Sequence, residues 1–332
     1  MTNSKILIIH QGAIGDLILS LPAINAIREH FTNHIFSFMG SLSTLELLPV
    51  EKEQAVSIQI PGFSSLYTTK PDPSEELKQY LRQFEKVVIF GMKSEDVLVK
   101  SLKMIGVQDV LRIETFPDRN IHVIDHQAAV LSSAGIEVKN RTHRINIERK
   151  DARLADEELL RHNLVETNDR IIFLHPGSGS MKKSWSPISF ALLAQYLQDT
   201  LNIKIVIIEG PADGAQVEEF YKYFNGGSTV RIVSPPLRTL AALLKRGKCF
   251  AGNDSGITHL SAAVGTPTVA LFGPTDPGVW GPRGGNVHII TETVDCSPCN
   301  QETLKACARQ RCLENISVET VYHVIQGILD NS

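Results

Sequence analysis

Several features that mark broad protein classes are missing from this 332-residue sequence. Its 33 lysines and arginines nearly balance its 36 aspartates and glutamates, and a net charge of −3 gives no basic field for nucleic acid. No apolar run approaches the roughly 20 residues of a membrane-spanning helix. The apolar start, Ile6–Ile9, is too short for a secretory signal and ends at His10 and Gln11. We therefore expect a cytoplasmic protein, with peripheral contact to a membrane surface left open.

Motifs of several large enzyme classes are also absent. There is no G-x-x-x-x-G-K-[ST], which disfavours P-loop chemistry. The first glycine turn, Gly12–Gly15, lacks G-x-G-x-x-G and so weakens a dehydrogenase interpretation. There is no G-x-S-x-G nucleophile turn. No Asp-x-Asp follows a strand in the manner of a magnesium-held sugar nucleotide.

What is present is a regular alternation of apolar strands and amphipathic helices. The content of 42% hydrophobic and 21% charged residues is that of a globular protein with substantial cores. The alternation predicts an α/β fold with parallel sheets and right-handed crossovers, and the length predicts two domains. Strands are expected at 5–9, 35–39, 56–60, 87–90, 171–174, 203–208, 250–252 and 268–272. Helices are expected at 17–30, 74–84, 122–134, 156–162, 187–199, 215–224, 237–245 and 318–329. The polar, basic stretch 140–146, with further charges up to Asp151, is the predicted linker.

Three small-residue turns follow predicted strands. They are Gly12–Asp16, His175–Ser178 and Asn253–Leu260. A turn that opens a helix presents free backbone N–H groups and the positive end of the helix dipole, and phosphate is the usual guest. Since ligands of open α/β sheets bind at the carboxyl ends of strands, the three turns predict one cleft built from both halves of the chain.

Two charged residues are candidates for chemistry, one on the first turn and one after the His175–Ser178 turn. Asp16 opens the first helix, where a carboxylate either caps the helix or serves as a general base. Lys183 is either a solvated surface charge or a cation that neutralises a diphosphate leaving group. Trp185, close by, is expected to pack and fix the loop.

Two further polar residues have both a structural and a functional interpretation. Asp213 is expected to cap the helix at 215–224, with binding of ribose hydroxyls as the functional alternative. His259 is either a core residue or a donor to phosphate, one turn into its helix.

Four of the five cysteines cluster near the C-terminus: Cys296, Cys299, Cys307 and Cys312. In a reducing compartment this cluster is either a metal or redox site or a set of packed reduced thiols. Metal sites usually pair two tight C-x-x-C hooks, whereas the second pair here is spaced more widely. We therefore expect reduced thiols and no bound metal.

In this order, the motifs resemble glycosyltransferase family 9, the bacterial heptosyltransferases of lipopolysaccharide core assembly. The likeness runs through nearly the whole chain. It rests on Gly15-Asp16 with Leu21-Pro22-Ala23, His175-Pro176-Gly177, Lys183-Ser184-Trp185, Gly210-Pro211-Ala212-Asp213, Asn253-Asp254-Ser255-Gly256 with His259, Gly265-Thr266-Pro267 and Leu271–Thr275.

The resemblance implies a GT-B architecture, with two Rossmann-like domains whose parallel sheets face an interdomain cleft. Residues 1–150 would bind the acceptor, 151–316 would bind the nucleotide sugar, and the helix in 317–332 would cross back to the first domain. It implies inverting transfer of heptose from ADP-L-glycero-β-D-manno-heptose to a lipid-linked core acceptor, without a cofactor or a catalytic metal.

Site residues carry over from the family position by position. Asp16 matches the base and Lys183 the phosphate-binding lysine. Asp213 matches an acidic ribose contact, and Asp254, Ser255, Gly256 and His259 match the diphosphate-binding loop. Gly15 and Ser178 are further predicted contacts to the nucleotide sugar. Basic residues of the first domain would face the acceptor, with Lys93, Arg119, Arg141 and Arg144 as candidates by composition. Three alternatives stay open at this point: another nucleotide sugar, a protein acceptor, or a protein that binds a nucleotide sugar without turning it over.

Overall fold

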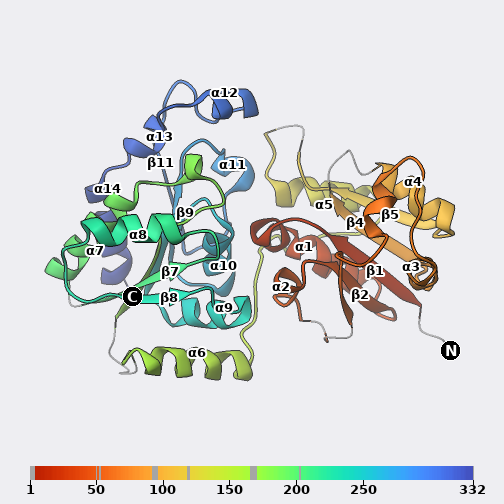
Figure 1. Ribbon diagram of the computed structural model, residues 1–332, viewed down its shortest axis with the longest axis horizontal. Helices are drawn as coiled ribbons and strands as arrows, with labels where there is room; N and C mark the ends of the chain where they lie inside the picture. The colour runs from red at the N-terminus through yellow and green to blue at the C-terminus, as the bar shows by residue number, and fades with distance from the viewer. Residues whose placement is uncertain are drawn as a thin grey trace. The chain divides into compact units, whose positions relative to one another are not determined.

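The computed structural model describes residues 4–49, 51, 54–91, 96–117, 120–164, 170–201 and 203–331. The chain divides into two compact units, residues 1–143 and 144–332 (Figure 1). In each unit the strands form a sheet whose paired neighbours all run parallel. The prediction of two parallel α/β domains is therefore confirmed.

The first unit has a five-stranded sheet in the order β3-β2-β1-β4-β5. Its strands are β1 (Lys5–His10), β2 (Ile35–Gly40), β3 (Ala55–Ser57), β4 (Lys86–Gly91) and β5 (Asp109–Glu114). Alternate strand residues such as Leu7 and Ile9 pack with the 3-10 helix η2 (Phe63–Tyr67), α3 (Glu75–Leu81) and α4 (Asp96–Ile105). Because strand side chains alternate between faces, Ile6 and Ile8 point to the opposite layer. The helices α1 (Ile14–His30) and α5 (Val123–Ser133) pack against each other, and a short α2 (Leu42–Leu45) follows β2.

The second unit has a six-stranded sheet in the order β11-β10-β9-β6-β7-β8. Its strands are β6 (Ile171–His175), β7 (Lys204–Glu209), β8 (Val230–Val233), β9 (Cys249–Asn253), β10 (Thr268–Phe272) and β11 (Val287–Thr291). Counted within the unit, this is the strand order of the Rossmann fold.

Helices of the second unit fall into two packed groups. One core joins the sheet to α7 (Pro187–Thr200), α8 (Gly214–Tyr223) and α14 (Val318–Asp330). A second group joins α6 (Arg149–Arg161), α9 (Leu237–Arg246) and α10 (Gly256–Val264). The short elements are the 3-10 helix η4 (Met181–Lys183), α11 (Pro277–Trp280), α12 (Gln301–Ala306) and α13 (Arg311–Glu314).

The final helix packs in the core of the second unit, and the boundary between the units falls within the predicted linker. The expected crossing of this helix to the first domain stays a prediction. The helix α14 buries Val321 and Ile325 in the core of the second unit, where it lies beside α7 (Figure 1). The unit boundary falls between residues 143 and 144, and α6 begins at Arg149 inside the stretch expected to be linker. The helix α6 begins at Arg149 because its first turn contains Asp151. This buried carboxylate accepts the Glu148 N–H (3.2 Å) and pairs with Arg238 of α9.

Three strands escaped prediction, and all three involve sheet edges. They are β5, β8 and β11, whose sequences intersperse charged or polar residues among apolar ones. An edge strand has a partner on one side alone, so it lacks the continuous apolar run that marks a central parallel strand.

Each sheet has a point where the strand order reverses. In the first unit this point lies between β1 and β4, and in the second it lies between β6 and β9. Ligands of open α/β sheets bind outside the carboxyl ends of the strands at such points. The β1–α1 turn, the residues after β6 and the β9–α10 turn are therefore the places to examine for function.

Candidate functional site

The β9–α10 junction forms a helix start suited to an anion. Ser255 is the N-cap of α10, and its hydroxyl lies 3.4 Å from the Thr258 backbone nitrogen, whose hydrogen it accepts. The N–H groups of Gly256 and Ile257 belong to the first turn, so they have no partner within the helix. The helix dipole adds partial positive charge there. The helix start predicted at this turn is confirmed, and His259 lies one turn into α10.

Lys183 and Asp254 meet beside this helix start. The Lys183 ammonium donates to Asp254 Oδ2 at 2.8 Å, although the two residues are 71 positions apart in the chain. The lysine side chain is 31% exposed and the aspartate 9%. A nearly buried carboxylate needs a compensating charge, and the lysine supplies it while keeping access to solvent. A cation is thereby held at the end of β9, next to the free N–H groups of α10.

Asn253 joins three segments at this edge; it opens the motif quoted from the sequence but was assigned no role there. It is fully buried, and its amide donates to the carbonyls of Pro176 (2.9 Å) and Gly177 (3.2 Å). Its side-chain oxygen accepts the backbone N–H of Trp185 at 2.7 Å. The residues after β6, the loop bearing Lys183 and the β9–α10 turn thus share one side chain. The signal for it was its place as the last residue of β9.

Trp185 fixes the lysine loop, as predicted. The indole is 1% exposed, stacks edge-on against Phe190 with ring centroids 5.0 Å apart, and donates from Nε1 to the Ile316 carbonyl at 3.0 Å. Ser178 helps from the other side of the loop, where its hydroxyl contacts the Ser180 carbonyl (2.5 Å) and the Ser184 hydroxyl (2.7 Å). These contacts therefore hold the loop that bears Lys183 in a defined conformation.

The expected helix cap at Asp213 is wrong. Asp213 occupies the N-cap position of α8, but its side chain makes no capping bond to that helix. Its Oδ2 accepts instead from Gly210 N–H (2.8 Å) and lies 2.9 Å from His175 Nε2. Burial raises the pKa of Asp213, but the hydrogen bonds from His175 and from the Gly210 N–H lower it, and the net pKa lies below the usual value. The carboxylate is therefore ionised and held at the end of β6.

His259 lies in the second unit with a buried side chain, 4% exposed, within the first turns of α10. Gly15 is the second residue of α1 in the first unit. Contacts of these residues, of Ser178 and of Asp213 with a nucleotide sugar stay predictions.

The β1–α1 junction of the first unit places Asp16 in the first turn of α1. Its Oδ2 accepts the Ala13 N–H at 2.9 Å, which satisfies one of the free donors of the helix start. The turn is tight, because a Cβ on Gly12 would lie 2.5 Å from Asp16 Cβ. The capping role weighed for Asp16 is therefore present, and it fixes the carboxylate at the carboxyl end of β1.

A buried polar network supports Asp16 from behind. Ser20 donates its hydroxyl to the Asp16 carbonyl (2.8 Å) and accepts from Gln127 of α5 (3.1 Å). His10, the last residue of β1, lies with Nε2 3.3 Å from the same hydroxyl. Burial lowers the pKa of His10 to about 4, partly opposed by a hydrogen bond with the Asp16 backbone. The imidazole is therefore neutral at pH 7.

The cysteine-bearing segment is docked onto the second unit. Cys299 donates its backbone N–H to Pro274 (2.7 Å), and Ser297 donates its hydroxyl to Gly273 (2.5 Å). Lys182 donates from its ammonium to the carbonyls of Leu304 and Lys305, 2.6 Å each, at the end of α12. All cysteines are free thiols, and the described residues hold no group of three or more His, Cys, Asp or Glu side chains suited to a metal ion.

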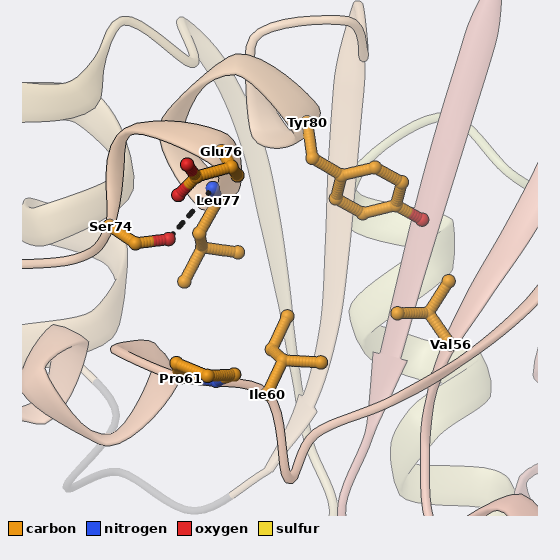
Figure 2. Close-up of a pocket in the computed structure, with 7 residues that line it drawn as sticks. All are labelled: Val56, Ile60, Pro61, Ser74, Glu76, Leu77 and Tyr80. Carbon is orange, nitrogen blue, oxygen red and sulfur yellow. Dashed lines mark hydrogen bonds between the residues drawn. The ribbon is translucent and has the colours of Figure 1, made fainter.

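An apolar cavity of about 420 Å³ lies in the first unit, apart from these residues. Val56, Ile60, Pro61, Leu77 and Tyr80 line it, with Ser74 and Glu76, and Figure 2 shows the Ser74 hydroxyl capping Leu77 N–H. None of the predicted site residues borders this cavity.

The proposed acceptor-facing residues are only partly described. Lys93 and Arg119 lie outside the described residues. Arg144 is exposed, and Arg141 pairs with Asp125 at 2.8 Å. Within the described ranges, none of the helices combines the length and apolar character needed to cross a bilayer.

Comparison with known proteins agrees with this architecture. The family model described as glycosyltransferase family 9 (heptosyltransferase) matches residues 86–308. Lipooligosaccharide heptosyltransferase 2 of Campylobacter jejuni is 25% identical over 327 residues, covering 96% of each chain. A glycosyltransferase family 9 structure from Veillonella parvula gives a TM-score of 0.78 at 20% identity, covering 100% of this chain and 99% of that one. The structure of Escherichia coli ADP-heptose lipopolysaccharide heptosyltransferase II gives 0.75 at 16%, covering 98% and 99%.

Two Rossmann-like units of this kind define the GT-B architecture of glycosyltransferases. Since the family model spans well over half of the chain, the protein belongs to glycosyltransferase family 9, as the motif order predicted.

Proposed function

We propose that this protein is an inverting heptosyltransferase. It would move heptose from ADP-L-glycero-β-D-manno-heptose to a lipopolysaccharide core acceptor, either lipid A–Kdo or a core heptose. The observation that carries the donor half of this proposal is the pairing of Lys183 with Asp254 beside the start of α10. The names of the related heptosyltransferases support the sugar and the nucleotide.

In the proposed donor complex the diphosphate occupies the helix start. The Gly256 and Ile257 N–H groups donate to its oxygens, and Lys183 shares its charge between Asp254 and the ligand. Negative charge grows on the diphosphate as its bond to the anomeric carbon breaks. A preorganised cation and backbone dipoles stabilise that charge without reorganising. In this proposal Lys183 fills the place of a divalent cation, and turnover should persist in EDTA.

The proposed acceptor step assigns Asp16 as general base. Its carboxylate takes the proton of an acceptor hydroxyl, whose oxygen forms the new bond to the anomeric carbon opposite the departing ADP. Inversion follows from that in-line geometry. The Ala13 N–H and the Ser20 contact hold Asp16 in place, so little ordering is needed at the moment of transfer. The acceptor is lipid-linked, so we further propose cytoplasmic action at the inner membrane surface.

Calorimetric titration with ADP, UDP, GDP and CDP tests the donor assignment. We expect ADP to bind and the other three to bind at least about tenfold more weakly, a difference of about 1.4 kcal/mol. Tighter binding of a diphosphate with another nucleobase would reject an ADP-sugar as the donor. A second assay then follows release of ADP from ADP-heptose, with and without a lipid A–Kdo acceptor. Binding without acceptor-dependent release would reject transfer.

A further inference from the structure

Two buried side chains and a partly buried one form a hydrogen-bonded chain that ends at the α10 start. Asp213 Oδ2 lies 2.9 Å from His175 Nε2, and His175 Nδ1 lies 3.3 Å from the Ser255 hydroxyl. Residues 175, 213 and 255 come from the carboxyl ends of β6, β7 and β9, so the chain runs across the strand-order reversal. His175 and Asp213 are 2% and 6% exposed. The two side chains therefore contact each other and are almost completely shielded from solvent.

The Asp213 carboxylate is enclosed by glycine backbone. A Cβ on Gly177 would lie 2.1 Å from Asp213 Oδ1, and a Cβ on Gly210 would lie 2.6 Å from Oδ2. Contacts this close are possible only because both positions lack a side chain. The carboxylate is thus packed against the ends of β6 and β7 rather than presented to a sugar.

An ionised carboxylate only accepts hydrogen bonds, so His175 Nε2 carries a proton and donates to Asp213. In the neutral imidazole Nδ1 is then the acceptor, and the Ser255 hydroxyl donates to it. This direction leaves the Ser255 lone pairs for the Thr258 N–H, which lies 3.4 Å away. The tautomer set by Asp213 therefore decides how Ser255 caps α10.

We propose that Asp213 and His175 are positioning residues, which orient Ser255 so that α10 presents its Gly256 and Ile257 N–H groups to the donor diphosphate. This rests on the proposed function, and it assigns Asp213 a task other than ribose binding. With Asp213→Asn the amide oxygen takes the Oδ2 position, because that atom must still accept the Gly210 N–H. A neutral amide oxygen is a weaker acceptor for Nε2–H than a carboxylate, so the imidazole is no longer held in the tautomer whose Nδ1 accepts from Ser255.

The test measures dissociation constants by calorimetry for ADP and for 2′,3′-dideoxy-ADP, which lacks both ribose hydroxyls. We expect Asp213→Asn to weaken both ligands by the same factor, about tenfold, within the range measured for coupled sites. In a Ser255→Ala background the same substitution should change neither. Asp199→Asn, an equal charge change on an exposed residue of α7, is the matched control and should leave both constants unchanged.

A second pair of variants guards against general unfolding. His175→Asn keeps an amide near the Nδ1 position and should bind ADP more tightly than His175→Ala, while Asp213→Asn adds nothing in either background. If Asp213→Asn weakens ADP but not the dideoxy analogue, Asp213 contacts ribose and the proposal is overturned. An unchanged affinity, or equal weakening with and without Ser255, overturns it as well. Absence of ADP binding by the unmodified protein would instead reject the proposed function.

Discussion

The first strand of each unit ends in a histidine, and the surroundings of the two histidines differ. His10 ends β1 and lies against the Ser20 hydroxyl, whereas His175 ends β6 and pairs with the Asp213 carboxylate. The turn after β1 reaches its helix within three residues and brings in a carboxylate, Asp16. The connection after β6 takes eleven residues and brings in a cation, Lys183.

The comparison shows how one topology can serve two halves of a reaction. A short turn holds a carboxylate close to a strand end, where it can accept a proton. A long connection can carry a cation to the next strand's helix start, where it meets an anion. In the proposed reaction the first unit would deprotonate the acceptor and the second would stabilise the leaving group. Three experiments sharpen or break this division.

The largest effect is expected at Asp16. Asp16→Asn retains an oxygen for the Ala13 N–H, so the helix start survives, but the amide cannot take a proton. We expect kcat to fall by about 10²–10⁴-fold with ADP affinity unchanged. Steady-state kinetics and ADP calorimetry measure the two quantities. The control is Glu29→Gln, which removes an exposed charge from the same helix. A near-normal kcat for Asp16→Asn would reject Asp16 as the general base.

A smaller effect is expected at Lys183. Lys183→Ala removes the cation that balances Asp254, so the helix start is left with an uncompensated negative charge. We expect kcat to fall by about 10²–10³-fold and the KM for the donor to rise. Lys222→Ala, an exposed lysine of α8, controls for net charge. If both kinetic constants match those of the parent enzyme, the leaving group is stabilised elsewhere.

The smallest effect concerns stability and the neutral histidine. Unfolded His10 takes up a proton below pH 6.5, but burial lowers its folded pKa to about 4. Its stabilising contribution is therefore complete above pH 6.5 and is lost as pH falls toward 4. Between pH 7.5 and 5 this loss is worth about 2 kcal/mol of unfolding free energy. Urea unfolding at both pH values should show that loss in His323→Gln, which removes an exposed histidine, but not in His10→Gln. An equal loss of unfolding free energy between the two pH values in both variants would contradict a neutral His10.

The sequence predicted the central strands and the long helices because burial on both faces leaves an unbroken apolar signal. Leu7, Ile8 and Ile9, for example, are all fully buried. The start of α6 was missed because its first turn is charged, and its stability comes from Asp151 and Arg238, which lie 87 positions apart. Pairings of that kind are decided by tertiary contact and leave no local pattern.

For the site, the turns could be predicted from the sequence, whereas the side-chain contacts between them could not. The helix start at α10 was predicted from a small-residue turn that follows a strand, and Lys183 from its place between the His175 turn and the next helix. The roles of Asn253 and His175 depend on which strands become neighbours. Strand order was not derivable from spacing, so the link between β6 and β9 could not be foreseen. The cap expected at Asp213 failed for the same reason, since its partner His175 lies 38 positions earlier.

The hold of Lys182 on the end of α12 ties two distant parts of the chain together. The carbonyls that it grips belong to residues more than 120 positions away, and the lysine next to it in sequence is the one paired with Asp254. Cys299 and Cys307 flank α12 on either side. Alkylation of those thiols would therefore disturb the contact between α12 and the Lys182 ammonium. Through Lys182 it would also displace the adjacent Lys183, although the two lysines are far from the cysteines in the sequence.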